Sequence, residues 1–180
     1  MTITPDTTMG FIMDQIPGAR RALFARYHLG GCQSCGFSPN ETLKALCARN
    51  GDIDTDEMIQ HLIAAHEHDN SVLLTPSEAK DRLSGPTPPI LLDCRTREEH
   101  DAVTIPQSRL LTQELQQQLF SENPQQEIIL FDHQGKHALD TCAWFHGHGM
   151  KNTYVMRGGI DAWSLEIDPS LPRYQLEIPT

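Results

Sequence analysis

Residues 89–94 read Pro89-Ile90-Leu91-Leu92-Asp93-Cys94, and residues 127–131 read Glu127-Ile128-Ile129-Leu130-Phe131. Both stretches are short and almost continuously apolar, which is typical of strands buried on both faces of a parallel sheet. Similar strands are predicted at residues 72–74 and 152–156, and helical patterns follow at residues 75–83, 113–120, 136–147 and 160–164. This alternation predicts an α/β fold in which helices flank a parallel sheet.

The first 69 residues show short helical patterns separated by turn signals. We expect a helix at residues 19–27 and another after Ser38-Pro39-Asn40-Glu41, where a cap, a proline and a glutamate form a capping box. Asp54 and Glu57 repeat the box before a further helix. The sequence therefore predicts a small all-α domain over residues 1–69 and an α/β domain over residues 70–180. The boundary is expected in the polar, non-periodic stretch 66–70.

The composition argues against some classes of partner. The chain has 180 residues, with 24 Asp and Glu against 14 Lys and Arg, for a formal charge of −10. This balance argues against nucleic-acid partners and anionic membranes, which require clustered basic residues. No apolar run approaches the roughly 18 residues of a membrane span, and no signal peptide is recognised, so we expect a cytoplasmic protein. Its five cysteines then suggest reactive or metal-binding thiols rather than structural disulfides.

Two groups of residues in the second half resemble the signatures of rhodanese-like domains. The first group consists of Asp93-Cys94-Arg95, Glu99-His100 and Ile105-Pro106. The second is Tyr154-Val155-Met156-Arg157-Gly158-Gly159-Ile160-Asp161-Ala162-Trp163. The resemblance covers about residues 72–175 and implies a rhodanese-like parallel sheet flanked by helices. His100 stands where an aromatic residue is usual, and Val103-Thr104 where Gly-His is usual.

The resemblance also implies where sulfur chemistry would occur. In rhodanese-like enzymes a cysteine after the fourth strand takes sulfur from a donor such as thiosulfate and holds it as a persulfide. The corresponding loop here consists of Asp132, His133, Gln134, Gly135, Lys136 and His137. Asp132 stands at the position of the nucleophile, and a carboxylate cannot carry a persulfide and would repel an anionic donor. The resemblance therefore predicts an inactive module used for docking or regulation, not a thiosulfate sulfurtransferase.

The strongest chemical signal in the first half is Gly30-Gly31-Cys32-Gln33-Ser34-Cys35. Two cysteines at this spacing can close a disulfide or offer two soft ligands to a metal. The helix expected after Ser38 would lower the pKa of the nearby Cys35 thiol through its N-terminal partial charge.

The stretch 9–62 resembles the small helical redox-disulfide domain associated with hybrid-cluster proteins. The matching residues are Pro17, Gly30 to Cys35, Thr42-Leu43, Cys47 and Gly51-Asp52-Ile53-Asp54. This resemblance implies a redox-active or metal-binding cysteine pair.

We therefore expect an accessory protein in thiol redox or sulfur relay, in which Cys32 and Cys35 exchange with a protein partner that has a thiol or a persulfide. No cofactor is expected, and no oligomeric state is assigned. One alternative is a zinc- or iron–sulfur-binding adaptor with Cys32, Cys35 and Cys47 as ligands. A second is a sulfurtransferase that uses Cys94. Cys47, Cys94 and Cys142 lie in apolar patterns typical of buried cysteines.

Overall fold

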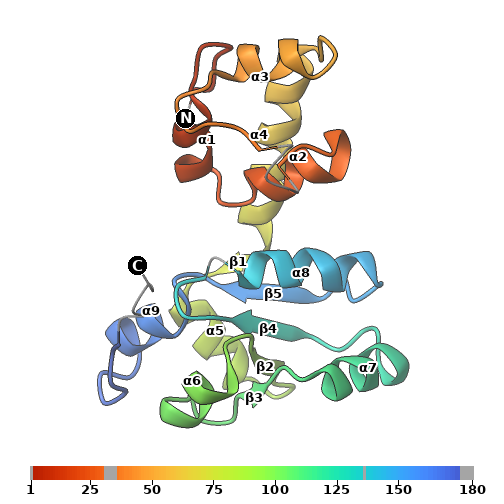
Figure 1. The fold of residues 1–180 in the computed structure, drawn as a ribbon. Helices are drawn as coiled ribbons and strands as arrows, with labels where there is room; N and C mark the ends of the chain where they lie inside the picture. Colours follow the sequence, from red (N-terminus) through yellow and green to blue (C-terminus); the bar gives the residue numbers. More distant parts are fainter. Residues whose placement is uncertain (1, 31–35, 136, 175–180) are drawn as a thin grey trace. The chain divides into compact units, whose positions relative to one another are not determined.

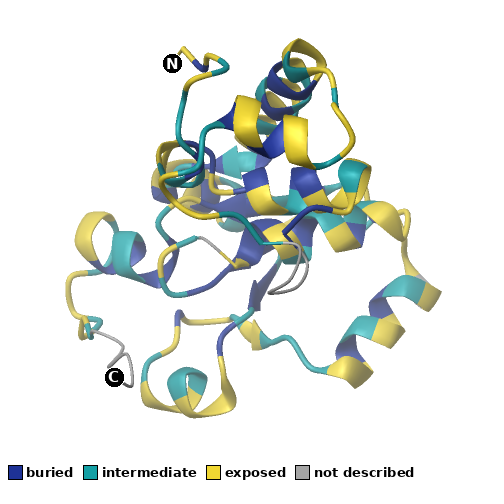
Figure 2. Cartoon of the chain, turned by 45° about the horizontal axis from the view of Figure 1, so that its top comes forward, coloured by how far each residue is buried: buried dark blue, intermediate teal, exposed yellow. Residues whose placement is uncertain are grey.

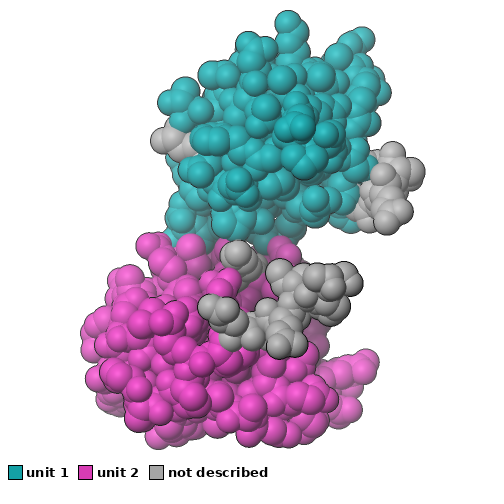
Figure 3. Space-filling view, turned by 60° about the vertical axis from the view of Figure 1, so that its left-hand side comes forward, with its two compact units in different colours: residues 1–71 teal, residues 72–180 magenta. Residues whose placement is uncertain are grey.

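The computed structural model describes residues 2–30, 36–135 and 137–174. The chain divides into two compact units, Met1–Ser71 and Val72–Thr180 (Figure 3).

The first unit is helical. Its helices are α1 (Met9–Gln15), α2 (Ala19–Tyr27), α3 (Leu43–Arg49) and α4 (Thr55–Val72), the last of which ends at the first residue of the second unit. Their apolar faces meet in one core that includes Met9, Ile12, Leu23, Leu46 and Leu62. The α2 helix begins and ends where its sequence pattern predicts, and His28 ends it in the left-handed conformation with φ 56°.

The prediction of a helix cap at Ser38 is wrong. The α3 helix starts at Leu43, and Thr42 Oγ1 accepts a hydrogen bond from the Ala45 N–H at 3.2 Å. The segment before it is held outside the helix, because the Pro39 carbonyl accepts from Gly10 and the Glu41 carbonyl accepts from Met9, both at 2.8 Å. Backbone contacts with α1 therefore override the local capping signal.

The polar stretch 66–70 is not an irregular linker, since it forms the last turns of α4. Two contacts hold the helix against α2. Arg21 forms an ion pair with Asp69 at 2.6 Å, and His61 Nε2 lies 3.0 Å from the Ala22 carbonyl oxygen. A helix with a polar surface remains stable when such tertiary contacts support it, so polarity alone did not indicate its end.

In the second unit, the described residues form one five-stranded parallel sheet in the order β1-β5-β4-β2-β3 (Figure 1). The strands are β1 (Leu73–Leu74), β2 (Ile90–Asp93), β3 (Arg109–Leu110), β4 (Ile128–Phe131) and β5 (Thr153–Met156). The helices between and after them are α5 (Pro76–Leu83), α6 (Arg97–Ala102), α7 (Gln113–Glu122), α8 (Ala138–Gly147) and α9 (Gly159–Glu166). The predicted α/β fold with a parallel sheet flanked by helices is confirmed.

The sheet is buried on both faces. Ile128 and Leu130 of β4 belong to the core shared with α7 and α8, whereas Ile129 and Phe131 belong to the core shared with α5 and α9. All four β4 residues are fully buried (Figure 2). The continuous apolar run of this strand follows from this two-sided packing.

Two short elements, α6 and β3, have too little apolar periodicity to be predicted. The α6 helix has no buried residues and is fixed by a capping box between Thr96 and Glu99. The similar box of Thr75 and Glu78 at α5 is present as its sequence indicates. No helix in the described part of the chain is long and apolar enough to cross a membrane.

Candidate functional site

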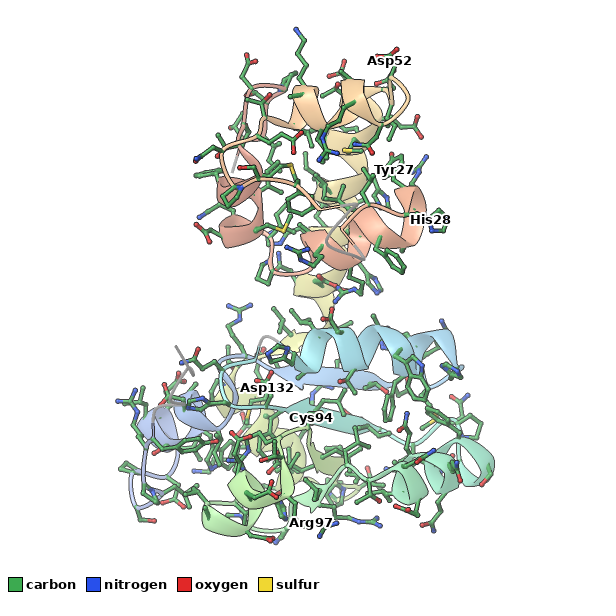
Figure 4. All side chains as sticks on the ribbon, viewed as in Figure 1. Tyr27, His28, Asp52, Cys94, Arg97 and Asp132 are labelled. Carbon is green, nitrogen blue, oxygen red and sulfur yellow. The ribbon has the colours of Figure 1, made fainter. Side chains whose placement is uncertain are left out.

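The candidate site lies where β2 and β4 end. These strands are parallel neighbours with Asp93 opposite Phe131, and the Cys94 N–H donates to the Phe131 carbonyl at 2.8 Å. The residue that follows each strand, Cys94 or Asp132, therefore lies at the same edge of the sheet (Figure 4). Ligand sites of open α/β sheets form at this carboxyl edge.

Backbone N–H groups surround the carboxylate of Asp132. Its Oδ1 accepts from Gly135, and its Oδ2 accepts from His137 at 2.6 Å and from Ala138 at 3.0 Å. Ala138 begins α8, so the partial positive charge of this helix end also favours the carboxylate. Asp132 is 5% exposed. The loop thus forms an anion cradle that the protein fills with its own carboxylate.

The glycine pair before α9 allows close packing against this loop. The Asp132 carbonyl accepts from the Ile160 N–H at 2.9 Å, and the His133 carbonyl accepts from Asp161 at 3.2 Å. Gly159 has φ 58°, and a Cβ there would clash with the Asp132 carbonyl oxygen. The start of α9 therefore fixes the loop backbone, and a side chain at residue 159 would displace it.

A buried ion pair supports the same edge of the sheet. Asp93 is fully buried and binds Arg95 through two side-chain contacts, Nε to Oδ1 at 2.9 Å and Nη2 to Oδ2 at 2.6 Å. His100 Nδ1 lies 2.8 Å from the same Oδ2. A bidentate pair with further hydrogen bonds compensates the cost of burying these charges. The first group of rhodanese-like residues therefore has a structural role at this edge of the sheet, where Asp93, Arg95 and His100 bind one another.

The C-terminal segment joins this group of residues through Tyr174. Its hydroxyl accepts from Arg95 Nη1 and donates to Glu99 Oε1, both at 2.8 Å. Its ring stacks on His133 with centroids 4.4 Å apart. Burial raises the pKa of Tyr174, so its hydroxyl stays protonated at neutral pH. Tyr174 thus holds the loop and α6 together, a role that its sequence position did not indicate.

Cys94 is a partly buried thiol. Its side chain packs against the apolar core on the α7–α8 side of the sheet. Burial raises its pKa well above the ordinary value, and the carboxylates of Asp132 and Asp93 raise it further. Since the thiolate is the nucleophile in sulfur transfer, this environment disfavours Cys94 as a reactive residue.

Cys47 and Cys142 are core residues, each 1% exposed. Cys47 Sγ lies 3.5 Å from Met58 Sδ, and burial raises the pKa of its thiol. The Cys142 thiol donates to the Thr153 carbonyl at 3.4 Å. Among the residues that the structure describes, no three or more His, Cys, Asp or Glu side chains gather as metal ligands. The buried position of Cys47 disfavours it as a third ligand.

Cys32 and Cys35 lie outside the described residues, as does Lys136. Two arginines hold the chain on either side of the cysteine pair. Arg20 Nη1 donates to the Gly30 carbonyl at 3.0 Å and its guanidinium lies over the Phe37 ring at 5.0 Å. Arg49 Nη2 donates to the Gly36 carbonyl at 2.7 Å. The helix that was expected after Ser38 to lower the pKa of Cys35 begins only at Leu43, so its N-terminus is farther along the chain from Cys35 than the sequence indicated.

Comparison with known proteins gives the family of the second unit. The family model of the rhodanese-like domain matches residues 75–166. The chloroplastic rhodanese-like/PpiC domain-containing protein 12 of Arabidopsis thaliana is 35% identical over 52 residues, which are 29% of this chain and 17% of that protein. The matched segment thus spans less than a fifth of the length of this relative.

Two solved structures are similar to part of this chain at low sequence identity. A rhodanese-like domain protein from Staphylococcus aureus is 23% identical, with a TM-score of 0.46 over 57% of this chain and 98% of that one. A rhodanese-like domain from Anabaena sp., solved in solution, is 16% identical, with a TM-score of 0.47 over 61% and 89%. The family match covers just over half of the 180 residues, and on this basis the chain belongs to the rhodanese-like domain family.

Proposed function

We propose that this protein is a cytoplasmic accessory protein in thiol redox or sulfur relay, and that its rhodanese-like domain is a catalytically inactive docking module. One observation carries the second part of the proposal: the Asp132 carboxylate accepts three backbone hydrogen bonds in the cradle of its loop. Asp132 stands where the family has its nucleophilic cysteine. A carboxylate in that cradle takes the donors that an anionic sulfur intermediate would need, and it repels an anionic donor.

The exchange chemistry is assigned to Cys32 and Cys35. The thiolate of one cysteine attacks a sulfur of a partner's disulfide, and the partner's S–S bond breaks to release one thiolate. The second cysteine then attacks the mixed disulfide and releases the other partner thiolate. Two electrons pass from the cysteine pair to the partner, and a Cys32–Cys35 disulfide remains. No cofactor is needed in this sequence of steps.

The surroundings of the pair support this assignment. Arg20 binds the carbonyl group of Gly30, two residues before Cys32, and positive charge near a thiol favours its thiolate. Arg49 binds the carbonyl group of Gly36, but its charge is paired with Glu41. The zinc or iron–sulfur alternative is weaker, because Cys47 packs against Met58 in the core. The Cys94 alternative is weaker because of the raised pKa of that thiol.

Native mass spectrometry of the anaerobically purified full chain tests the proposal. We expect the reduced and oxidised forms to differ by two hydrogens in wild type, and this difference to disappear in the Cys32→Ser/Cys35→Ser variant. The matched control is Cys142→Ser, which retains the pair. Stoichiometric zinc or iron that is lost in the double variant would instead establish the adaptor.

Sulfurtransferase activity is tested separately with thiosulfate and cyanide. We expect no thiocyanate from wild type above the uncatalysed rate. Thiocyanate formation that is lost in Cys94→Ala would overturn the assignment of the rhodanese-like domain as inactive.

A further inference from the structure

The residues on either side of the cysteine segment lie next to each other. Gly30, which precedes the segment, has φ 82°, and a Cβ on it would lie 3.1 Å from Cε1 of Phe37, which follows the segment. In the sequence, Cys32 comes two residues after Gly30, and Cys35 comes two residues before Phe37. Two residues of chain span at most about 7 Å. A group bound to both Gly30 and Phe37 is therefore connected to each cysteine by a very short length of chain.

Arg20 of α2 is such a group. Its Nη1 donates to the Gly30 carbonyl oxygen at 3.0 Å, and its guanidinium carbon lies 5.0 Å from the centroid of the Phe37 ring. A guanidinium is attracted to the face of an aromatic ring, so the ring and the carbonyl group together hold it in this position. Arg20 is exposed, so a molecule that approaches from the solvent can reach its side chain.

The charge of Arg20 is available to such a molecule. No carboxylate in the described part of the chain forms an ion pair with Arg20, whereas each of the other two arginines of α2 pairs with an aspartate or a glutamate. A guanidinium has further N–H groups besides the one that binds Gly30, and their planar arrangement matches the two oxygens of a carboxylate. Arg20 can therefore bind an external carboxylate while it remains bound to Gly30.

The other groups beside the cysteine segment add little net charge. Residues 27–40 contain no Asp, Glu, Lys or Arg. Arg49 binds the Gly36 carbonyl, but Glu41 neutralises its charge through contacts with Nε at 2.5 Å and Nη2 at 3.0 Å. Although the whole chain has a formal charge of −10, the described groups that bind the two ends of this segment have an excess of one positive charge.

We propose that Arg20 selects the partner of the cysteine pair, and that this partner is a disulfide with carboxylates close to its sulfur atoms. A carboxylate of the partner binds the Arg20 guanidinium while a thiolate of the pair attacks the neighbouring sulfur. The partner's S–S bond breaks, its two halves leave as thiols, and the protein loses two hydrogens as the Cys32–Cys35 disulfide forms. This inference rests on the proposed function, because it gives the chemistry of the partner for the same cysteine pair.

The experiment measures how fast three small disulfides oxidise the pair in the full chain. On closely similar scaffolds, 3,3′-dithiodipropionate is a dianion, 2-hydroxyethyl disulfide is neutral and cystamine is a dication. Intact mass follows the loss of two hydrogens, and the Cys32→Ser/Cys35→Ser variant gives the background from the other thiols. For each disulfide, the ratio of the wild-type rate to the rate of an arginine variant cancels the intrinsic reactivity of that disulfide.

We expect Arg20→Gln to slow oxidation by the dianion about two- to fivefold, which is the range for one exposed ion pair, and to accelerate oxidation by the dication. The rate with the neutral disulfide should stay the same, and Arg20→Lys, which retains the charge, should retain most of the preference for the dianion. The preference should disappear at about 1 M salt, where the Debye length is about 3 Å.

The matched control is Arg26→Gln, which removes the same charge from an exposed position of the same helix. Arg26 is paired with Glu57, and we expect its replacement to change the three rates by the same factor. A variant that only loosens the cysteine segment would also change the three rates by one factor, so a difference between the dianion and the dication reports the charge of Arg20 itself.

Glutathione disulfide and the disulfide-linked dimer of N-acetyl-glutamyl-cysteinyl-glutamate amide then distinguish two sources of the carboxylates. A larger dependence on Arg20 with the first indicates a small-molecule partner, and a larger dependence with the second indicates a protein cysteine flanked by acidic residues. Equal rate ratios for the three small disulfides in Arg20→Gln would overturn this inference and leave the proposed function intact. If the neutral disulfide produces no oxidation that depends on Cys32 and Cys35, the proposed function itself fails.

Discussion

Replacing Asp132 with asparagine tests how strongly the carboxylate is bound in its loop. Wild-type Oδ2 accepts from His137 and Ala138, and Oδ1 accepts from Gly135. The single carbonyl oxygen of asparagine can replace Oδ2, but its NH₂ group then faces the Gly135 N–H. One donor loses its acceptor, at roughly 1–3 kcal/mol, and the other two bonds lose the assistance of charge. We expect the free energy of unfolding to fall by about 2–4 kcal/mol.

Urea unfolding followed by tryptophan fluorescence measures this change in the part of the chain that contains Asp132. Trp144 and Trp163, the two tryptophans of the chain, both lie in Val72–Thr180. The matched control is Asp101→Asn, an exposed aspartate of α6, which should stay within about 0.5 kcal/mol of wild type. If Asp132→Asn unfolds at the same urea concentration as this control, the carboxylate is not held by the cradle and the reasoning fails.

Three further predictions follow from the same contacts. Gly159→Ala should lower the free energy of unfolding by about 3 kcal/mol or more, because the residue has a positive φ and a Cβ there would clash with the Asp132 loop. Its control, Gly147→Ala, has open space around the new Cβ and should raise the free energy of unfolding by about 0.4–1 kcal/mol in the same urea assay. Tyr174→Phe loses two hydrogen bonds and should lower the free energy of unfolding by about 1–3 kcal/mol. Its control, Tyr27→Phe, removes a buried hydroxyl that has no partner among the described residues, so this change should be neutral or stabilising. Unfolding followed by circular dichroism measures both. The raised pKa of Cys94 should keep its alkylation by iodoacetamide slower than that of a free thiol up to about pH 9, as measured by peptide mapping. The free energy of unfolding should fall above the ordinary thiol pKa of about 8.5, because the unfolded state there loses a proton that the folded state retains, and unfolding at a series of pH values measures this fall. Rapid labelling of Cys94 in the native protein would contradict both expectations.

The elements that the sequence predicts best are those whose signals are local. The α5 helix has a capping box and a proline at its first position, and the buried strands β2 and β4 are continuous apolar runs. The α6 helix and β3 have no buried side chains that would produce a pattern, and they were missed.

Where local and tertiary signals compete, the tertiary contacts decide. Ser38-Pro39-Asn40-Glu41 is a valid capping sequence, but contacts of its carbonyl groups with α1 keep it outside the helix. The stretch 66–70 lacks periodicity, but the ion pair of Asp69 with Arg21 accompanies the continuation of α4 to Val72.

The sequence alone determined the α/β architecture and the identity of the residue at position 132, because apolar runs and side-chain types are encoded position by position. The tertiary structure decided what that residue does. The donors that bind Asp132 are backbone N–H groups, which every residue except proline possesses and which therefore have no sequence signature. Their direction depends on where α8 begins and on the packing of Gly159 against the loop, and both are set by contacts between distant segments of the chain.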